Sequence, residues 1–165
     1  MSQERYLSEY SKFVHGYFRT YGTLLVIGLA AAVLIGFLWE HPAALGLSGT
    51  LTALWMVSLI RCMGALRQEG RHCRALPDQL DQDQVHQEVS YLKKTRRRIR
   101  WEMNFFQVLF LLGLFGLVLL LLTGHKDGLS GLALGMVITS AIDQIALILY
   151  DHGLQEFAYQ LEKRS

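Results

Sequence analysis

One acidic side chain lies inside an otherwise uncharged apolar stretch near the end of the sequence. Asp143 is the single charge between Leu129 and Tyr150. A charge at the centre of a membrane helix costs about 2.5–3.5 kcal/mol on insertion scales, so it normally faces protein or water rather than lipid. Three roles fit this position: an ion pair, contact with a cation or proton along an aqueous path, and hydrogen bonding at the inner membrane interface.

Other polar residues of the apolar stretches could share a site with Asp143. Ser140 and Gln144 flank it in sequence, and Gln107 is the one amide of the preceding stretch. Such side chains form hydrogen bonds between membrane helices. We predict that these four residues contact an ion or line a pore. Arg61, which ends the second stretch, is the predicted pairing partner of Asp143, although a long basic side chain at a helix end can also extend to the headgroups.

Glycines in the fourth stretch predict close helix packing. Gly131 and Gly135 form a G-x-x-x-G motif, which lets two membrane helices approach closely, within one subunit or between subunits. The sequence Gly-Leu-Ser-Gly occurs twice, at 46–49 and at 128–131, and the same offset aligns Arg61 with Asp143. Either an internal duplication or chance similarity among small and apolar residues accounts for this repeat.

A dense basic run precedes the third apolar stretch. Beside a membrane, such cations determine topology and contact anionic lipid. Nucleic acid and acidic side chains of the same loop are rival partners, and we expect lipid rather than nucleic acid. The predicted lipid contacts are Lys93, Lys94, Arg96, Arg97, Arg98 and Arg100.

The sequence has no recognisable catalytic or metal-binding motif. It lacks a Walker loop, G-x-S-x-G and H-E-x-x-H. Cys62 and Cys73 do not have the spacing of a zinc site. The turn residues between stretches, which include His41 and Asp127, are expected to be solvated rather than to bind metal. We therefore predict no enzymatic activity, no cofactor and no metal ion.

Four apolar stretches must position these residues. The chain of 165 residues is 52% hydrophobic and only 18% charged, whereas soluble domains carry about 25% charged residues. About 20 helical residues cross a hydrocarbon layer about 30 Å thick. Buried helices of a soluble bundle would show a polar face at a period of 3.6 residues, and the third stretch shows none. We predict an all-α integral membrane protein with four transmembrane helices, starting from the stretches 21–39, 43–66, 105–122 and 129–150.

The distribution of Lys and Arg predicts how the chain is threaded. Of the 16 Lys and Arg residues, Lys126 alone lies in the two short connectors, and the other 15 lie on the opposite side. By the positive-inside rule, both termini and the middle loop are cytoplasmic. We therefore expect a multi-pass protein of the plasma (inner) membrane.

This threading divides the chain into five segments. The first has an aromatic face predicted to lie in the headgroup region or on a neighbouring subunit. Helical extensions of the second and third spans, separated by a turn at Pro77 and Asp78, are expected to project together as a cytoplasmic hairpin. The segments are an amphipathic interfacial helix (1–20), a transmembrane hairpin (21–66), a basic helical loop (67–100), a second hairpin (101–150) and a C-terminal helix (151–165).

The sequence constrains the function of this protein less than it constrains the fold. Four helices with several glycines rarely enclose a pathway, so a pore would require several copies. The leading hypothesis is a homo-oligomeric pore or channel for ions or small solutes. The alternative is a non-conducting membrane scaffold or accessory subunit that binds anionic lipid or a protein partner through its basic loop.

Overall fold

Four long helices make up the part of the protein that the structure describes. The computed structural model describes residues 3–76, 82–124 and 127–163, without the side chains of residues 3–5 and 7. The helices are α1 (Gln3–Leu38), α2 (Pro42–Ala75), α3 (Gln82–Leu122) and α4 (Gly128–Glu162). Each is long and apolar enough to cross a membrane. The predicted all-helical fold with four such helices is therefore confirmed, and it indicates a multi-pass membrane protein.

Residues at the short connectors set where the helices begin and end. Pro42 opens α2, where its missing N–H is not needed, and Nδ1 of His41 accepts a hydrogen bond from the Ala43 backbone N–H at 3.2 Å. The carboxylate of Asp127 caps α4 by accepting from the Leu129 N–H at 3.2 Å. After α3, Gly124 adopts a positive φ of 75° that favours glycine. The connector residues His41 and Asp127 thus serve as helix caps.

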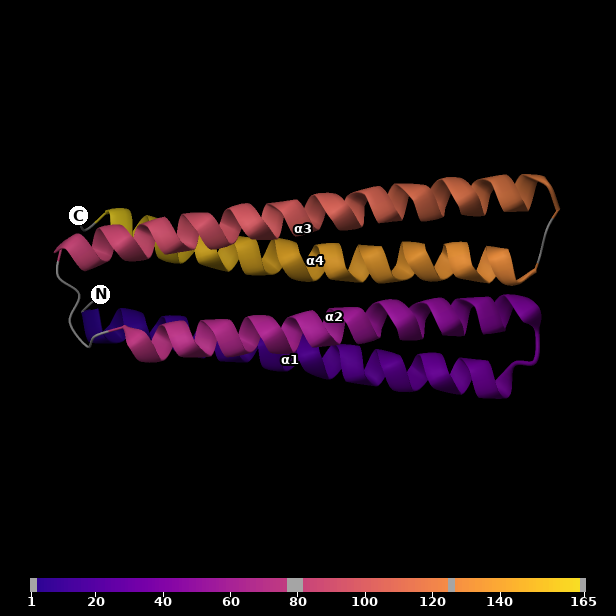
Figure 1. The fold of residues 1–165 in the computed structure, drawn as a ribbon, viewed down its shortest axis with the longest axis horizontal. Helices are drawn as coiled ribbons and strands as arrows, with labels where there is room; N and C mark the ends of the chain where they lie inside the picture. The colour runs from indigo at the N-terminus through magenta and orange to yellow at the C-terminus, as the bar shows by residue number, and fades with distance from the viewer. Residues whose placement is uncertain (1–2, 77–81, 125–126, 164–165) are drawn as a thin grey trace.

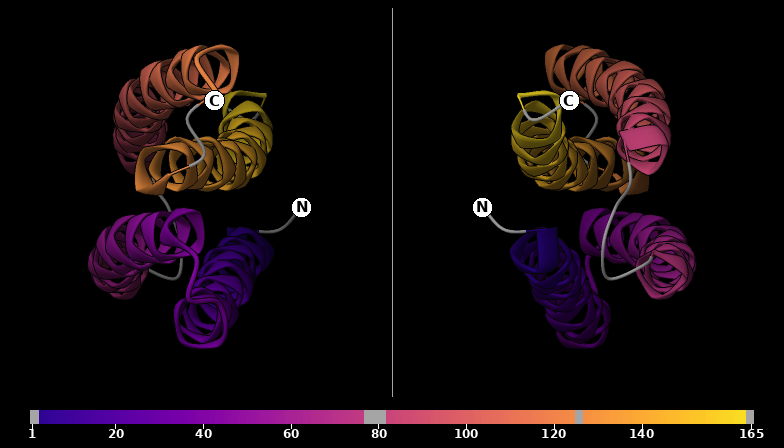
Figure 2. Two further views of the ribbon diagram at one scale, coloured as in Figure 1. Left: turned by 90° about the vertical axis from the view of Figure 1, so that its right-hand side faces the viewer. Right: turned by 90° about the vertical axis from the view of Figure 1, so that its left-hand side faces the viewer.

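The helices form two hairpins that meet along α2 and α4. Within the hairpins α1 packs on α2 and α3 packs on α4, and α2 packs on α4 between them. Both chain ends and the α2–α3 link lie at one end of the molecule, with the two short connectors at the other (Figure 1). In the end-on views, α1 and α3 lie on the outside of the α2–α4 pair at the end with the short connectors (Figure 2). Within the described residues, α2 and α3 make no direct backbone contact.

Glycines bring α2 and α4 together near the short connectors. A Cβ atom on Gly46 would collide with the backbone carbonyl of Gly128, and one on Gly131 would collide with the carbonyl of Ala43. Gly135 faces Thr50 of α2. The predicted G-x-x-x-G thus packs within the chain. Gly46 and Gly128 are equivalent positions of the repeat, so its two copies meet at this contact.

The helices continue through the segment boundaries predicted from the sequence. α1 runs without interruption from Gln3 across residue 20, and α2 to α4 likewise extend beyond their apolar stretches. The turn predicted at Pro77 and Asp78 lies outside the described residues. The aromatic face of the first segment has a different partner from either one predicted. Tyr6, Tyr10, Val14 and Phe18 of this face are buried against other helices of the same chain, and Tyr17 and Tyr21 are half-buried there.

Candidate functional site

Asp143 lies at a junction of three helices. Its side chain is fully buried and accepts hydrogen bonds from the Ser58 hydroxyl of α2, at 2.6 Å, and from the Tyr21 hydroxyl of α1. Two donors therefore compensate for the removal of this carboxyl group from water. Asp143 consequently joins α4 to both helices of the other hairpin, and its side chain does not face the surroundings of the protein.

The structure describes no hydrogen bond between Asp143 and the other predicted pore residues. Ser140 is fully buried, and its hydroxyl has no hydrogen-bond partner among the described residues. Gln144 is half-buried, with its amide nitrogen buried. Gln107 is exposed on the surface of α3. The structure thus places Ser140 and Gln144 in the neighbourhood of Asp143 and places Gln107 on a different face.

Arg61 contacts a residue that the sequence analysis did not single out. Its guanidinium forms an ion pair with Glu102 of α3 and lies 5.2 Å from the centre of the Phe106 ring. This replaces the direct Arg61–Asp143 pair predicted from the repeat. Arg61 extends toward α3, whereas Asp143 faces α1 and α2 and is already bonded to Tyr21 and Ser58. Arg61 lies within α2 and not at its end, and its long side chain reaches the Glu102 carboxylate across the α2–α3 gap.

Two further acidic side chains are buried in the half of the molecule that contains the chain ends. Glu69 accepts hydrogen bonds from the hydroxyls of Tyr10, at 2.9 Å, and Tyr91, at 3.0 Å. Glu88 accepts from the Tyr6 hydroxyl at 3.3 Å and lies 2.8 Å from Nε2 of His72. Burial, reinforced by the charge of Glu88, raises the pKa of Tyr6 above its ordinary value, so this phenol stays a donor.

The sequence analysis missed both of these acids, although one left a signal. Glu88 falls on the apolar helical face of Val85, Val89 and Leu92, where an acidic residue needs a partner. Glu69 lies between Arg67 and Arg71 in sequence, and this setting gives no sign of burial. Its burial depends on Tyr10 and Tyr91, which lie on two other helices.

One row of tyrosines on α1 contacts all three of these buried acids. We call Tyr6, Tyr10, Tyr17 and Tyr21 of α1 the tyrosine row. Tyr6, Tyr10 and Tyr21 bind the three buried acids, which lie on α3, α2 and α4 respectively. Tyr17 donates to the Ala146 backbone carbonyl at 2.8 Å and stacks on Tyr150. The row therefore links α1 to every other helix.

A cleft lies between α2 and α3 beside the tyrosine row. Its volume is about 260 Å³. Tyr17 and Tyr21 of α1 contribute to its base, and α4 contributes Leu147 and Tyr150. The charged residues that line it come from α2 and α3, and they are Arg61, Glu69, Lys94, Arg98 and Glu102. We call this space the α2–α3 cleft.

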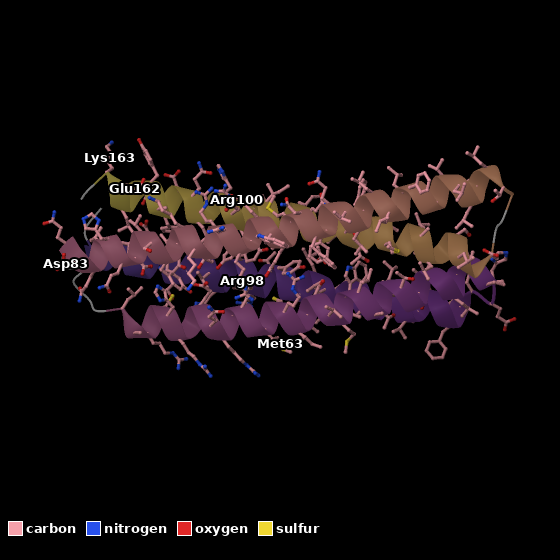
Figure 3. All side chains as sticks on the ribbon, turned by 45° about the horizontal axis from the view of Figure 1, so that its top comes forward. Met63, Asp83, Arg98, Arg100, Glu162 and Lys163 are labelled. Carbon is pink, nitrogen blue, oxygen red and sulfur yellow. The ribbon has the colours of Figure 1, made fainter. Side chains whose placement is uncertain are left out.

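Part of the basic run is occupied by contacts within the chain. Arg96 makes a two-point ion pair with Asp151, at 2.8 and 3.1 Å, and Lys93 pairs with Glu162. Arg98 contacts Glu102 and, across the cleft, donates to Gln68 at 3.1 Å. Figure 3 labels Arg98 between α3 and α2, and Arg100 on the other side of α3.

The remaining cations of this run are Lys94, Arg97 and Arg100. All three are exposed, and none of them has an ion-pair partner in the described ranges. Among the described residues, no group of three or more His, Cys, Asp or Glu side chains could hold a metal ion. The polar chemistry of this half therefore consists of buried acids with tyrosine donors and of cations at the cleft and the surface.

The chain matches no protein-family model, no curated protein and no solved structure.

Proposed function

We propose that this protein is a non-conducting membrane scaffold or accessory subunit that binds anionic lipid through its basic helical extension. The observation that supports this most directly is the burial of Asp143 with Tyr21 and Ser58 inside one chain. A carboxyl group that lines an oligomeric pore would face outward from the subunit. Here its two hydrogen-bond donors belong to the same chain, and it contributes to packing.

The contact between α2 and α4 also argues against a pathway through a single copy. Near the short connectors, Gly46 meets the backbone of Gly128, and Gly131 meets the backbone of Ala43. Helix backbones at this separation leave no space for a hydrated ion between them. The α2–α3 cleft is lined at one end by Ser58, Tyr21 and Phe106, and its other residues lie on the side of the chain ends. It is consistent with a binding site that is open toward one face.

The exposed cations support the lipid-binding part of the proposal. Lys94, Arg97 and Arg100 of α3 are exposed next to Trp101, an exposed aromatic residue of the kind enriched at membrane interfaces. Arg67, Arg71 and Arg74 add exposed cations on α2. Each Lys or Arg near an anionic leaflet contributes about 1 kcal/mol of attraction. Such a surface would hold anionic lipid around the extension or a partner with acidic groups.

Conduction is tested by planar-bilayer recording of the purified protein and of Asp143→Asn. We expect no current from either protein under conditions in which both are folded. Unitary currents from wild type that change in Asp143→Asn would overturn the proposal. A porin reconstituted in the same bilayers serves as the positive control for recording.

The proposed orientation has both termini and the basic extension in the cytoplasm. It is tested with Glu40→Cys and Arg74→Cys in a background where Cys62 and Cys73 are serine. A membrane-impermeant maleimide applied to intact cells should label Glu40→Cys, and labelling of Arg74→Cys should require permeabilised cells. The reverse pattern would contradict the positive-inside assignment.

A homo-oligomeric pore is the second candidate function, and Gln107 is the observation in its favour. This amide is exposed on the apolar surface of α3, where lipid offers no hydrogen-bond partner. A second copy could supply one. Mass measurement in mild detergent should show an oligomer that Gln107→Leu weakens. A monomer for both proteins would remove this support for a pore.

A further inference from the structure

The α2–α3 cleft lies at the depth of the phospholipid headgroups. About 28 Å of helix separate Pro42 from Arg61, and about 30 Å separate Leu122 from Glu102. The Arg61–Glu102 pair thus lies at the edge of a hydrocarbon layer about 30 Å thick that begins at the short connectors. By the same rise, Arg98 and Lys94 lie about 6 and 12 Å further out, among the headgroups.

The charges of the cleft favour an anion. Its lining contains three cations, Arg61, Lys94 and Arg98, and two acids. Both acids are engaged, since Glu69 accepts from two tyrosines and Glu102 contacts Arg61 and Arg98. Lys94 has no ion-pair partner in the described part of the chain. The cleft therefore presents one uncompensated ammonium group beside a guanidinium.

The apolar part of the lining distinguishes a lipid from a small soluble anion. Ile99, Phe106 and Leu147 line the cleft together with the charged residues. Beyond it, large apolar side chains are exposed on both adjoining helices, among them Val57 of α2, one turn before Arg61, and Phe105 of α3. Because α2 and α3 do not pack directly on each other, an acyl chain can follow these surfaces while its headgroup stays in the cleft.

We propose that the α2–α3 cleft binds the phosphate headgroup of one anionic phospholipid, with Lys94 and Arg98 contacting the phosphate. This inference rests on the proposed function, since both require anionic lipid. It adds one defined site to the general attraction of the exposed cations. It also assigns different roles to neighbouring basic residues, because Lys94 and Arg98 line the cleft whereas Arg97 and Arg100 do not.

The test is a lipid titration followed by native mass spectrometry of the full-length protein in neutral detergent. The probe is phosphatidylglycerol, with phosphatidylcholine as the uncharged comparison. The cleft variant is Lys94→Gln with Arg98→Gln, and the matched control, equal in charge change, is Arg97→Gln with Arg100→Gln. We expect the cleft variant to weaken binding of the first phosphatidylglycerol by about tenfold or more, and the control by less than about threefold.

A second variant tests the site without changing charge. Ala65 lines the cleft, and Ala65→Trp would occupy part of its volume. It should weaken phosphatidylglycerol binding as the cleft variant does, with thermal unfolding used to show that each variant is folded. Inorganic phosphate at millimolar concentration should not displace the lipid.

The other outcomes separate the two proposals. Equal losses in the cleft and control variants, with no effect of Ala65→Trp, would overturn the cleft site and leave lipid binding by the surface cations intact. Equal binding of phosphatidylglycerol and phosphatidylcholine by the wild-type protein would overturn the lipid-binding proposal itself. Displacement by inorganic phosphate would show a site for a soluble anion and overturn the lipid assignment.

Discussion

The two halves of the molecule are held together in different ways. Near the short connectors, α2 and α4 meet through glycines, and backbone lies against backbone at Gly46 and Gly131. Toward the chain ends, hydroxyl and carboxyl groups connect the helices, as in the Tyr10–Glu69 and Tyr6–Glu88 contacts. The first half resembles other membrane-helix contacts in its use of small residues. The second half resembles the polar interior of a soluble protein.

This difference explains where the cleft occurs. Helices in contact through glycines leave no space between them, whereas the described residues of α2 and α3 meet through side chains such as those of Arg61 and Glu102. Buried acids with satisfied hydrogen bonds can maintain such a spacing. Small residues therefore allow α2 and α4 to pack closely near the short connectors. Polar side chains maintain the α2–α3 cleft toward the chain ends.

The largest effect should come from a side chain added to the glycine contact. Gly131→Val would drive Cβ into the Ala43 carbonyl, and neither backbone can yield without moving a helix. We expect a loss of about 3 kcal/mol in the free energy of unfolding, measured by denaturant titration in detergent. Gly49 is the equivalent glycine of the repeat, and a Cβ added to it would meet no atom within 4 Å. Gly49→Ala should therefore leave the free energy of unfolding unchanged or raise it by up to about 1 kcal/mol. Similar losses for both would contradict the asymmetry of this contact.

A smaller effect is expected where the two halves meet. Asp143→Ala would leave the hydroxyls of Tyr21 and Ser58 without their acceptor in a buried site. The expected loss is about 2 kcal/mol by the same measurement. Asp143→Asn keeps one acceptor oxygen and should lose about half as much. Full stability of Asp143→Ala would mean that this junction does not hold α1, α2 and α4 together.

The contacts of the tyrosine row are each expected to contribute less. Tyr10→Phe removes one of the two donors to Glu69 and keeps the ring in place. Because Tyr91 remains, we expect a loss of about 1 kcal/mol in a thermal or chemical unfolding measurement. Tyr159 is exposed, so Tyr159→Phe provides the control and should leave stability unchanged. If the cost disappears in a Glu69→Gln background, the two residues act as a pair.

The smallest effect on the free energy of unfolding should come from an exposed ion pair in the half that contains the chain ends. Lys93 and Glu162 form an ion pair in which both side chains are well exposed to solvent. Lys93→Gln should change the free energy of unfolding by less than about 0.5 kcal/mol, because water and salt screen the charges. An effect comparable to that of Tyr10→Phe would show that the surface pairs, and not the buried acids, hold this half together.

The half of the fold near the short connectors could be predicted from the sequence, whereas the contacts of the half that contains the chain ends could not. Uninterrupted apolar stretches fix four helices, since no other structure satisfies the backbone of a single segment in lipid. Glu69 and Glu88 follow no such rule, because their burial depends on tyrosines from other helices. The Arg61–Asp143 prediction depended on the repeat, which places equivalent positions of its two copies at a similar depth. The structure does bring Gly46 to Gly128 in this way, but the longer Arg61 side chain reaches Glu102.

The tyrosine row also determines the order in which its buried hydrogen bonds can form while the chain is being synthesised. Tyr10 finds its acceptor once α2 has been made, Tyr6 once α3 has been made, and Tyr17 and Tyr21 only when α4 arrives. A nascent chain that stops before the fourth helix therefore leaves a phenol without its carboxylate in the apolar layer. α1 is made before the other three helices and is in this sense the last of the four to have all its partners.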